Sequence, residues 1–134
     1  MRKTSRLIII KENKILLIHR IKPNRDYYVF PGGAVEKGET KEEAAIRETK
    51  EETNLDIKID HFLWKFKNIF DKDKNLEYYF LIKKFKGVLK LRGPEAKKQT
   101  KDNQYLLEWI PLSKLKKISL FPEEIKIKVL KEFR

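Results

Sequence analysis

The sequence predicts an α/β fold in which a mixed β-sheet carries helices on both faces. Apolar, β-rich runs occur in pairs joined by short polar turns, as in antiparallel hairpins. Two helical segments interrupt these runs, one in the middle of the chain and one at its end. This interleaving is too irregular for a simple doubly wound parallel sheet. We expect residues 1–134 to form one domain, because 134 residues suffice for a substantial core.

The composition narrows the class of protein. The chain has no cysteine, which excludes a disulfide framework and thiolate metal sites. The longest apolar run near the N-terminus, residues 7–10, is too short for a signal peptide or a membrane span, so we expect a cytoplasmic protein without a membrane partner. The net charge of +12 favours polyanionic partners. The lysines are scattered, however, which argues against a dedicated nucleic-acid surface.

The first third of the chain is predicted to form strands. Residues 5–11 and 14–20 read as a hairpin joined by Glu12 and Asn13. His19 ends the second strand, and we interpret it as structural rather than as a catalytic base. Residues 22–26 are predicted to be a polar loop near the mouth of any cleft. Residues 27–30 form a short aromatic strand that ends at Pro31-Gly32-Gly33, where the glycines permit a close approach of backbone to ligand.

A helix is predicted to follow. Thr40 and Glu43 form a T-x-x-E capping box, so the helix should begin at Lys41. Nothing interrupts it before Thr53, and Asn54 tolerates the left-handed conformation that ends many helices.

The end of this helix gathers carboxylates. Glu48 lies three residues before Glu51 and four before Glu52, so all three side chains become neighbours. Like charges at this spacing repel, and acidic groups in the last turn oppose the helix dipole. A hard divalent cation would resolve this conflict, since Mg²⁺ commonly joins carboxylates to substrate phosphates. The alternative is a solvated acidic face balanced by nearby basic residues.

The surrounding sequence favours the metal site. Residues 33–55, GAVEKGETKEEAAIRETKEETNL, resemble the Nudix hydrolase signature G-x5-E-x7-R-E-U-x-E-E-x-G-U, where U is a bulky aliphatic residue. The matching residues are Gly33, Glu39, Arg47, Glu48, Glu51, Glu52 and Leu55. Two positions depart from the signature. Thr49 replaces an aliphatic residue, and Asn54 replaces the last glycine but can form the same cap.

The resemblance implies a Nudix-type α/β/α sandwich and a metal-dependent hydrolase. Its expected cofactor is Mg²⁺, with Mn²⁺ as the alternative. The expected metal ligands are Glu48, Glu51, Glu52 and the carbonyl of Gly33 or its neighbour Gly32, and both glycines are also expected to contact substrate.

Three further residues take expected roles from the same resemblance. Arg47 is an orienting group that holds the carboxylates by fork-like hydrogen bonds. Glu39 supports the site through Arg47 or through a metal-bound water. Tyr28 stands where related proteins carry an aromatic residue, and stacking on a base or filling the core remain equal alternatives for it.

The second half of the chain is predicted to contain another hairpin and a long loop. Residues 55–66 and 78–85 form the hairpin around a charged turn at 71–75. Residues 87–103 form the loop, from which related enzymes recruit an acidic residue. Glu95 is the candidate metal ligand or base, Asp102 competes with it, and Glu48 is the candidate base on the helix. A strand at 104–110, a short turn or helix through 116 and a last helix from Phe121-Pro122 complete the chain.

The resemblance implies hydrolysis of a nucleoside diphosphate linked to another group X. A MutT-like nucleoside triphosphate pyrophosphohydrolase is the first choice, and ADP-ribose or another nucleotide sugar is the second. A dinucleoside polyphosphate and an RNA 5′ end are further candidates. A Nudix-like module that binds nucleotide or RNA without turnover is the alternative of a different class, and the intact glutamate set argues against it. The chain is expected to act as a monomer or a homodimer.

Overall fold

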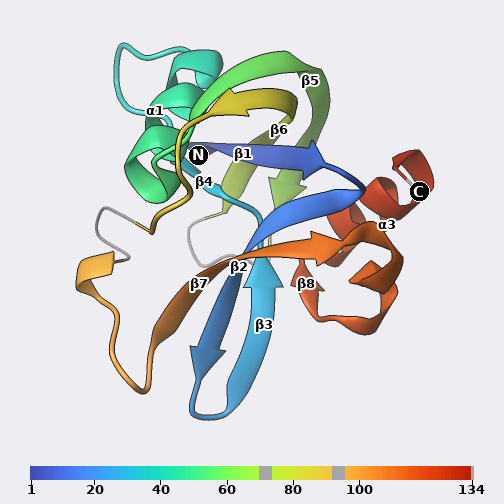
Figure 1. The fold of residues 1–134 in the computed structure, drawn as a ribbon. Helices are drawn as coiled ribbons and strands as arrows, with labels where there is room; N and C mark the ends of the chain where they lie inside the picture. Colours follow the sequence, from blue (N-terminus) through green and yellow to red (C-terminus); the bar gives the residue numbers. More distant parts are fainter. Residues whose placement is uncertain (70–73, 92–95, 134) are drawn as a thin grey trace.

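The computed structural model describes residues 1–69, 74–91 and 96–133. Figure 1 shows one curled sheet with helices beside it. The strands are β1 (Arg2–Lys11), β2 (Lys14–Lys22), β3 (Arg25–Val29), β4 (Gly32–Ala34), β5 (Asp56–Asn68), β6 (Asn75–Lys86), β7 (Gln104–Pro111) and β8 (Leu120–Phe121). The helices are α1 (Lys41–Thr53), the 3₁₀ helix η1 (Leu112–Lys117) and α3 (Glu123–Glu132).

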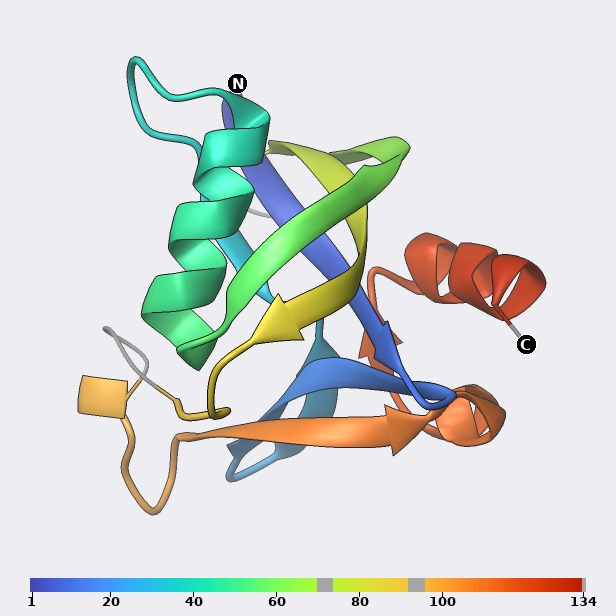
Figure 2. The same ribbon diagram turned by 45° about the horizontal axis from the view of Figure 1, so that its top comes forward.

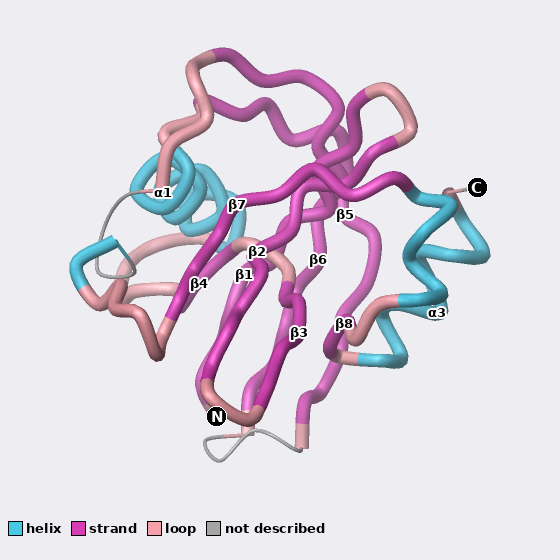
Figure 3. The backbone as a smooth tube through the Cα atoms, turned by 60° about the horizontal axis from the view of Figure 1, so that its bottom comes forward, coloured by secondary structure: helices cyan, strands magenta, loops and turns pink. Residues whose placement is uncertain are grey.

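The sheet is mixed, as predicted. Its main order is β5-β6-β1-β2-β3-β8, with β4 added to β1 and β7 added to β2. Strand β1 runs parallel to β6 and β3 runs parallel to β8, whereas the other pairs are antiparallel. Strands β1 and β2 pair only near their shared turn, so β2, β3 and β7 form a group of neighbouring strands that diverges from β1, β4, β5 and β6 (Figure 3).

Helices lie on both sides of the sheet (Figure 2). Each covered face has its own core of buried side chains. On one face, Ala45 of α1 packs with Leu7, Ile9 and Leu16. On the other face, side chains of η1 and α3 pack against alternate residues of the same strands, namely Ile8, Ile15, Leu17, Tyr79 and Leu81. This alternation confirms the predicted three-layer arrangement, because successive side chains of a strand point to opposite faces.

One predicted loop is wrong. Residues 22–26 are not an open loop, because β2 continues to Lys22 and β3 begins at Arg25. Only Pro23 and Asn24 form the turn, and Lys22 pairs directly with Arg25. This segment is polar because it is the exposed end of a hairpin, and not because it lacks regular structure. Within the described ranges, no helix has the length and apolar character needed to cross a membrane.

Candidate active site

Helix α1 is fixed at both ends as its sequence predicts. The Thr40 hydroxyl accepts a hydrogen bond from the backbone N–H of Glu43, and the Glu43 carboxylate accepts one from the backbone N–H of Thr40. At the other end Asn54 adopts the left-handed conformation, with φ 70°. The Ser5 hydroxyl of β1 also donates to the Lys41 carbonyl at 2.7 Å, which ties the first turn to the sheet.

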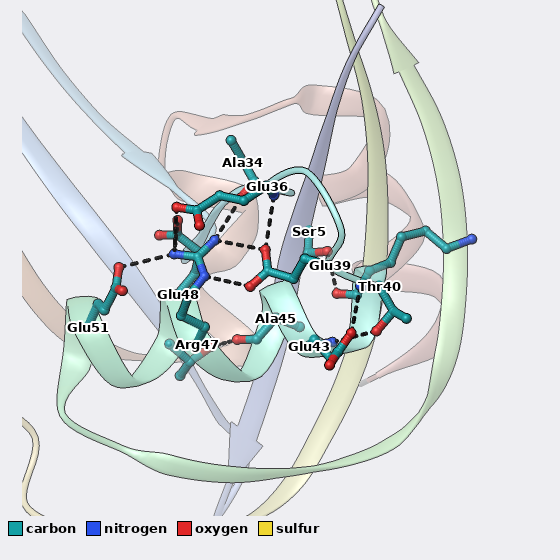
Figure 4. A network of polar contacts seen from close by, with 12 residues as sticks. Ser5, Ala34, Glu36, Glu39, Thr40, Glu43, Ala45, Arg47, Glu48 and Glu51 are labelled. Carbon is teal, nitrogen blue, oxygen red and sulfur yellow. Dashed lines mark hydrogen bonds and ion pairs between the residues drawn. The ribbon is translucent and has the colours of Figure 1, made fainter.

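Arg47 organises the carboxylates on the outer side of α1 (Figure 4). Its Nε and Nη2 donate to the two oxygens of Glu39 at 2.6 and 3.1 Å. Its Nη1 donates to Glu48 at 2.9 Å and to Glu51 at 3.1 Å, and lies 3.7 Å from a Glu36 oxygen. Arg47 Nη2 also donates to the Ala34 carbonyl of β4 at 3.0 Å, so one guanidinium links helix, turn and strand.

The electrostatics of this cluster follow from these contacts. The hydrogen bonds from Arg47 lower the pKa of Glu39, and the backbone N–H of Glu36 lowers it further. The pKa of Arg47 is raised, chiefly by Glu39, and the negative charge of Glu48 adds to the effect. Both groups therefore remain charged throughout the neutral pH range. Glu39 contacts Arg47 directly, and its supporting role stays a prediction.

Glu52 lies on the inner side of the helix, where it is 5% exposed. Its carboxylate accepts a hydrogen bond from the backbone N–H of Gly32 at 3.0 Å. Gly32 has φ 141°, and a Cβ placed there would lie 2.0 Å from the Ser5 carbonyl oxygen. A Cβ on Gly33 would lie 2.3 Å from the carboxylate of Glu48. The fold therefore requires glycine at position 32, whereas a side chain at position 33 would displace the carboxylate of Glu48.

These groups share one cleft of about 500 Å³ between α1 and the sheet. Six predicted residues line it, namely Gly32, Gly33, Arg47, Glu48, Glu51 and Glu52. The other wall includes Arg2, Arg6, Arg20, Tyr27 and Tyr105, which the sequence did not single out. Alternation along β2 and β3 was the available signal, because Ile18 and Arg20 share one face and so do Tyr27 and Val29.

Tyr28 is placed elsewhere. It points to the sheet face opposite the cleft, where its ring stacks on His19 with ring centres 4.1 Å apart. Its hydroxyl donates to Glu108 at 3.3 Å. Of the two adjacent tyrosines, Tyr27 lines the cleft and Tyr28 packs at the edge of the core, so the geometry favours the core-filling alternative.

The structure places only one of the two candidate bases from the loop before β7. Glu95 lies outside the described residues. Asp102 is exposed in the turn before β7 and is not among the residues that line the cleft.

The donor set suits a hard divalent cation, because every side-chain ligand offered on α1 is a carboxylate oxygen. Over residues 1–69, 74–91 and 96–133, no three acidic or histidine side chains already converge on one metal position. The contacts explain this arrangement. Arg47 Nη1 lies between Glu48 and Glu51, and Glu52 is turned toward Gly32. Four carboxylates surround Arg47 within 4 Å, so this cluster carries more negative than positive charge.

Comparison with known proteins agrees with the signature. The NUDIX domain model matches residues 1–132. The chain belongs to the Nudix family. Its Thr49, which departs from the Nudix signature, is fully buried, and its hydroxyl donates to the Ala45 carbonyl at 2.7 Å. The polar atom is therefore satisfied, and the departure leaves the helix intact.

The chain is similar to a named pyrophosphatase and to two solved structures of MutT proteins. An ADP-ribose pyrophosphatase of Methanocaldococcus jannaschii is 38% identical over 122 residues, which are 88% of this Nudix chain and 66% of that protein. The chain thus spans slightly less than two thirds of this relative. A MutT Nudix hydrolase structure from Burkholderia pseudomallei has a TM-score of 0.76 at 24% identity, covering 95% of each chain. A MutT structure from Bacillus halodurans has a TM-score of 0.75 at 25% identity, covering all of this chain and 85% of the other.

Proposed function

We propose that this Nudix protein hydrolyses the diphosphate linkage of a nucleoside diphosphate joined to another group X, and that it requires a divalent metal ion. The supporting observation is the meeting of Glu48, Glu51 and Glu52 with the Gly32-Gly33 backbone in one cleft. Arginines line the same cleft, so cationic groups for phosphate oxygens lie beside acidic groups for a metal ion.

The residues of α1 would hold the ion. Glu48, Glu51 and Glu52 supply carboxylate oxygens, and the carbonyl of Gly33 or Gly32 supplies a neutral one. When bound, Mg²⁺ or Mn²⁺ polarises the diphosphate and lowers the pKa of a coordinated water. Arg47 restrains Glu48 and Glu51 by hydrogen bonds, which reduces the motion available to these two side chains.

The reaction also needs a proton acceptor as water attacks phosphorus. Glu48 is the candidate within the described cleft, since its side chain is 21% exposed and lies against Gly33. Glu95 remains the candidate from the loop. Glu95→Gln should lower kcat strongly only if that loop reaches the site, and a rate near that of the unmodified protein would leave Glu48 as the acceptor.

A nucleoside triphosphate is our first choice of substrate. Arg2, Arg6 and Arg20 line the cleft, and their guanidinium groups suit a substrate that presents several phosphate oxygens. ADP-ribose is the second choice, supported by the 38% identical pyrophosphatase.

The test is product release from a panel of nucleotides, measured with Mg²⁺, with Mn²⁺ and with a chelator. The panel contains canonical and oxidised nucleoside triphosphates, ADP-ribose, nucleotide sugars, dinucleoside polyphosphates and a triphosphorylated RNA. We expect chelator-sensitive hydrolysis of one class, with triphosphates fastest. Binding of metal and nucleotide without turnover of any member would contradict the proposal and favour a binding module.

A further inference from the structure

Strands β2, β3 and β7 present one face to the cleft. Ile18 and Arg20 of β2, Tyr27 and Val29 of β3, and Tyr105 of β7 all line it. Arg20 lies 3.5 Å from the centre of the Tyr105 ring and donates to the Gln104 carbonyl at 3.0 Å. The shape of this substrate wall therefore depends on how the three strands are held together.

The opposite face of the same strands carries a polar cluster centred on His19. The His19 Nδ1 lies 2.6 Å from a Glu108 oxygen of β7, and its Nε2 lies 2.5 Å from an Asp26 oxygen of β3. Tyr28 of β3 stacks on the ring and donates its hydroxyl to Glu108. One imidazole thus joins β2 to both β3 and β7.

The position of this cluster explains why its contacts matter. Ile15 and Leu17, which precede His19 on the same face of β2, are buried in the core beneath η1 and α3. Figure 1 shows the β2–β3 hairpin extending away from those helices. At His19 the apolar core gives way to polar contacts, although the His19 side chain is still only 14% exposed. Beyond the end of the helix layer, the contacts of His19 with Asp26 and Glu108 therefore hold these strands together in place of apolar packing.

A charged ring satisfies both short contacts best. A neutral imidazole carries one N–H, so it can donate to one carboxylate only and faces the other with a lone pair. An imidazolium donates to both. Burial lowers the pKa of His19, but the hydrogen bonds and charges of Asp26 and Glu108 raise it, and the net change is a rise.

The polar groups in contact with His19 can be named for the described part of the chain. They are Asp26 and Tyr28 from β3 and Glu108 from β7, and the two carboxylates are the charges that act on its pKa. Tyr28 stays neutral, because burial and the neighbouring Glu108 raise its pKa. Loss of the His19 proton therefore leaves two carboxylates against an uncharged ring.

We propose that His19 is a positioning residue for the substrate cleft: its charged ring ties β3 and β7 to β2 and so holds Arg20, Tyr27 and Tyr105 in place. Substrate affinity consequently falls as the pH rises and the ring loses its proton. This inference rests on the proposed function of the cleft, and it assigns His19 no contact with substrate.

The test compares His19→Gln with His19→Arg and with a matched control, His61→Gln. The chain has two histidines, and the His61 side chain is 56% exposed beside Asp60. We would measure KM and kcat between about pH 6 and pH 9, spanning the titration of histidine, and divide each value by that of the unmodified protein at the same pH. This ratio removes the titration of the substrate itself.

We expect His19→Gln to raise KM about threefold to fivefold near pH 6, the effect of losing a partly exposed ion-pair cluster, with kcat within about twofold. The ratio should approach one near pH 9. His19→Arg, which stays charged, should retain a low KM at both ends, and His61→Gln should give a ratio of one throughout. A ratio for His19→Gln that does not change with pH, or an equal effect from His61→Gln, would overturn the inference.

Asp26→Asn provides a second variant, since the Asp26 side chain is 64% exposed and its replacement should not prevent folding. Like His19→Gln, it should raise KM more at low pH than at high pH. A KM profile equal to that of the unmodified protein would contradict the role of the His19 cluster. Calorimetric binding of a nucleoside monophosphate separates this inference from the proposed function. Failure of turnover alone would contradict the proposed function. Failure of the Kd to follow the charge of His19 would contradict the positioning role.

Discussion

The molecule contains two clusters in which one cation holds several carboxylates, and they differ in charge balance. Four carboxylates lie within 4 Å of Arg47, whereas two contact His19. Counting these contacts alone, the Arg47 cluster has four carboxylates for one cation and the His19 cluster has two. Neighbouring carboxylates repel one another, so a divalent cation would relieve more repulsion in the Arg47 cluster than in the His19 cluster.

The two cations also differ in what they can respond to. A guanidinium stays charged at any pH that a folded protein tolerates, so the Arg47 cluster keeps its geometry. An imidazole loses its proton within the physiological range, so the His19 cluster can be switched off. The predictions that follow separate these two behaviours.

The largest effect should come from Glu52→Gln. Glutamine keeps an oxygen that can accept the Gly32 N–H but removes the negative charge. We expect metal-dependent turnover to fall by about a thousandfold or more, with the fold retained by circular dichroism. Glu42→Gln, an exposed change in the first turn of the same helix, is the control. Activity equal to that of the unmodified protein would remove Glu52 from the metal site.

A pair of glycine substitutions separates the fold from the site. Gly32→Ala meets the Ser5 carbonyl at a positive φ, so we expect a loss of about 3 kcal/mol or more in unfolding free energy. For Gly33→Ala the nearest atoms are those of the Glu48 carboxylate, the movable end of a side chain. We therefore expect an activity loss of about a hundredfold with a melting temperature close to that of the unmodified protein. Denaturant unfolding and initial rates would measure both, and equal effects on stability would contradict this division.

Arg47→Lys keeps the positive charge but removes the planar guanidinium, whose nitrogens donate to several carboxylates at once. It should lower activity about tenfold, because a lysine can restrain fewer of Glu39, Glu48 and Glu51 at once. Lys50→Arg, on the same helix, is the reverse exchange and should have little effect. If Arg47→Lys had full activity, charge alone rather than bidentate geometry would hold the site.

The smallest effects should appear in the pH dependence of thermal stability. The lowered pKa of Glu39 gives a stabilisation that is present above the ordinary carboxyl value of about 4.3 and lost as the pH falls through the folded value. The raised pKa of His19 gives a stabilisation that is fully present below about pH 6.5, the ordinary histidine value. This stabilisation is lost as the pH rises through the pKa of His19 in the folded protein. Glu39→Gln should flatten the acid limb of the melting curve against pH, and His19→Gln should flatten the alkaline limb. The reverse assignment would contradict both pKa directions.

The local features were predictable because their signals are local. The capping box at Thr40 and Glu43 fixes the start of α1, and the left-handed Asn54 fixes its end. The turn at Glu12 and Asn13 has the positive φ values expected for a tight hairpin. The glycine pair Gly32-Gly33 is likewise a local signal, because it predicts a backbone conformation that other residues rarely adopt, and Gly32 has a positive φ.

The rest depends on contacts between distant parts of the chain. Eight residues of β1 pair with β6, whose residues follow more than 70 positions later, and no local pattern specifies that pairing. It brings Arg6 beside Glu77, within 3.8 Å. Likewise, alternation shows that Tyr27 and Tyr28 face opposite sides of β3, but only the packed sheet shows which side is the cleft. Glu95 lies outside the described residues, and its role stays a prediction.

Mn²⁺ binding by calorimetry tests the central claim most directly, comparing the unmodified protein with Glu51→Gln and Glu108→Gln. Glu51 belongs to the Arg47 cluster, and Glu108 belongs to the His19 cluster. We predict that Glu51→Gln weakens Mn²⁺ binding about tenfold or more and that Glu108→Gln leaves it unchanged. Equal Mn²⁺ affinity in the unmodified protein and in Glu51→Gln would contradict the assignment of α1 as the metal-binding helix.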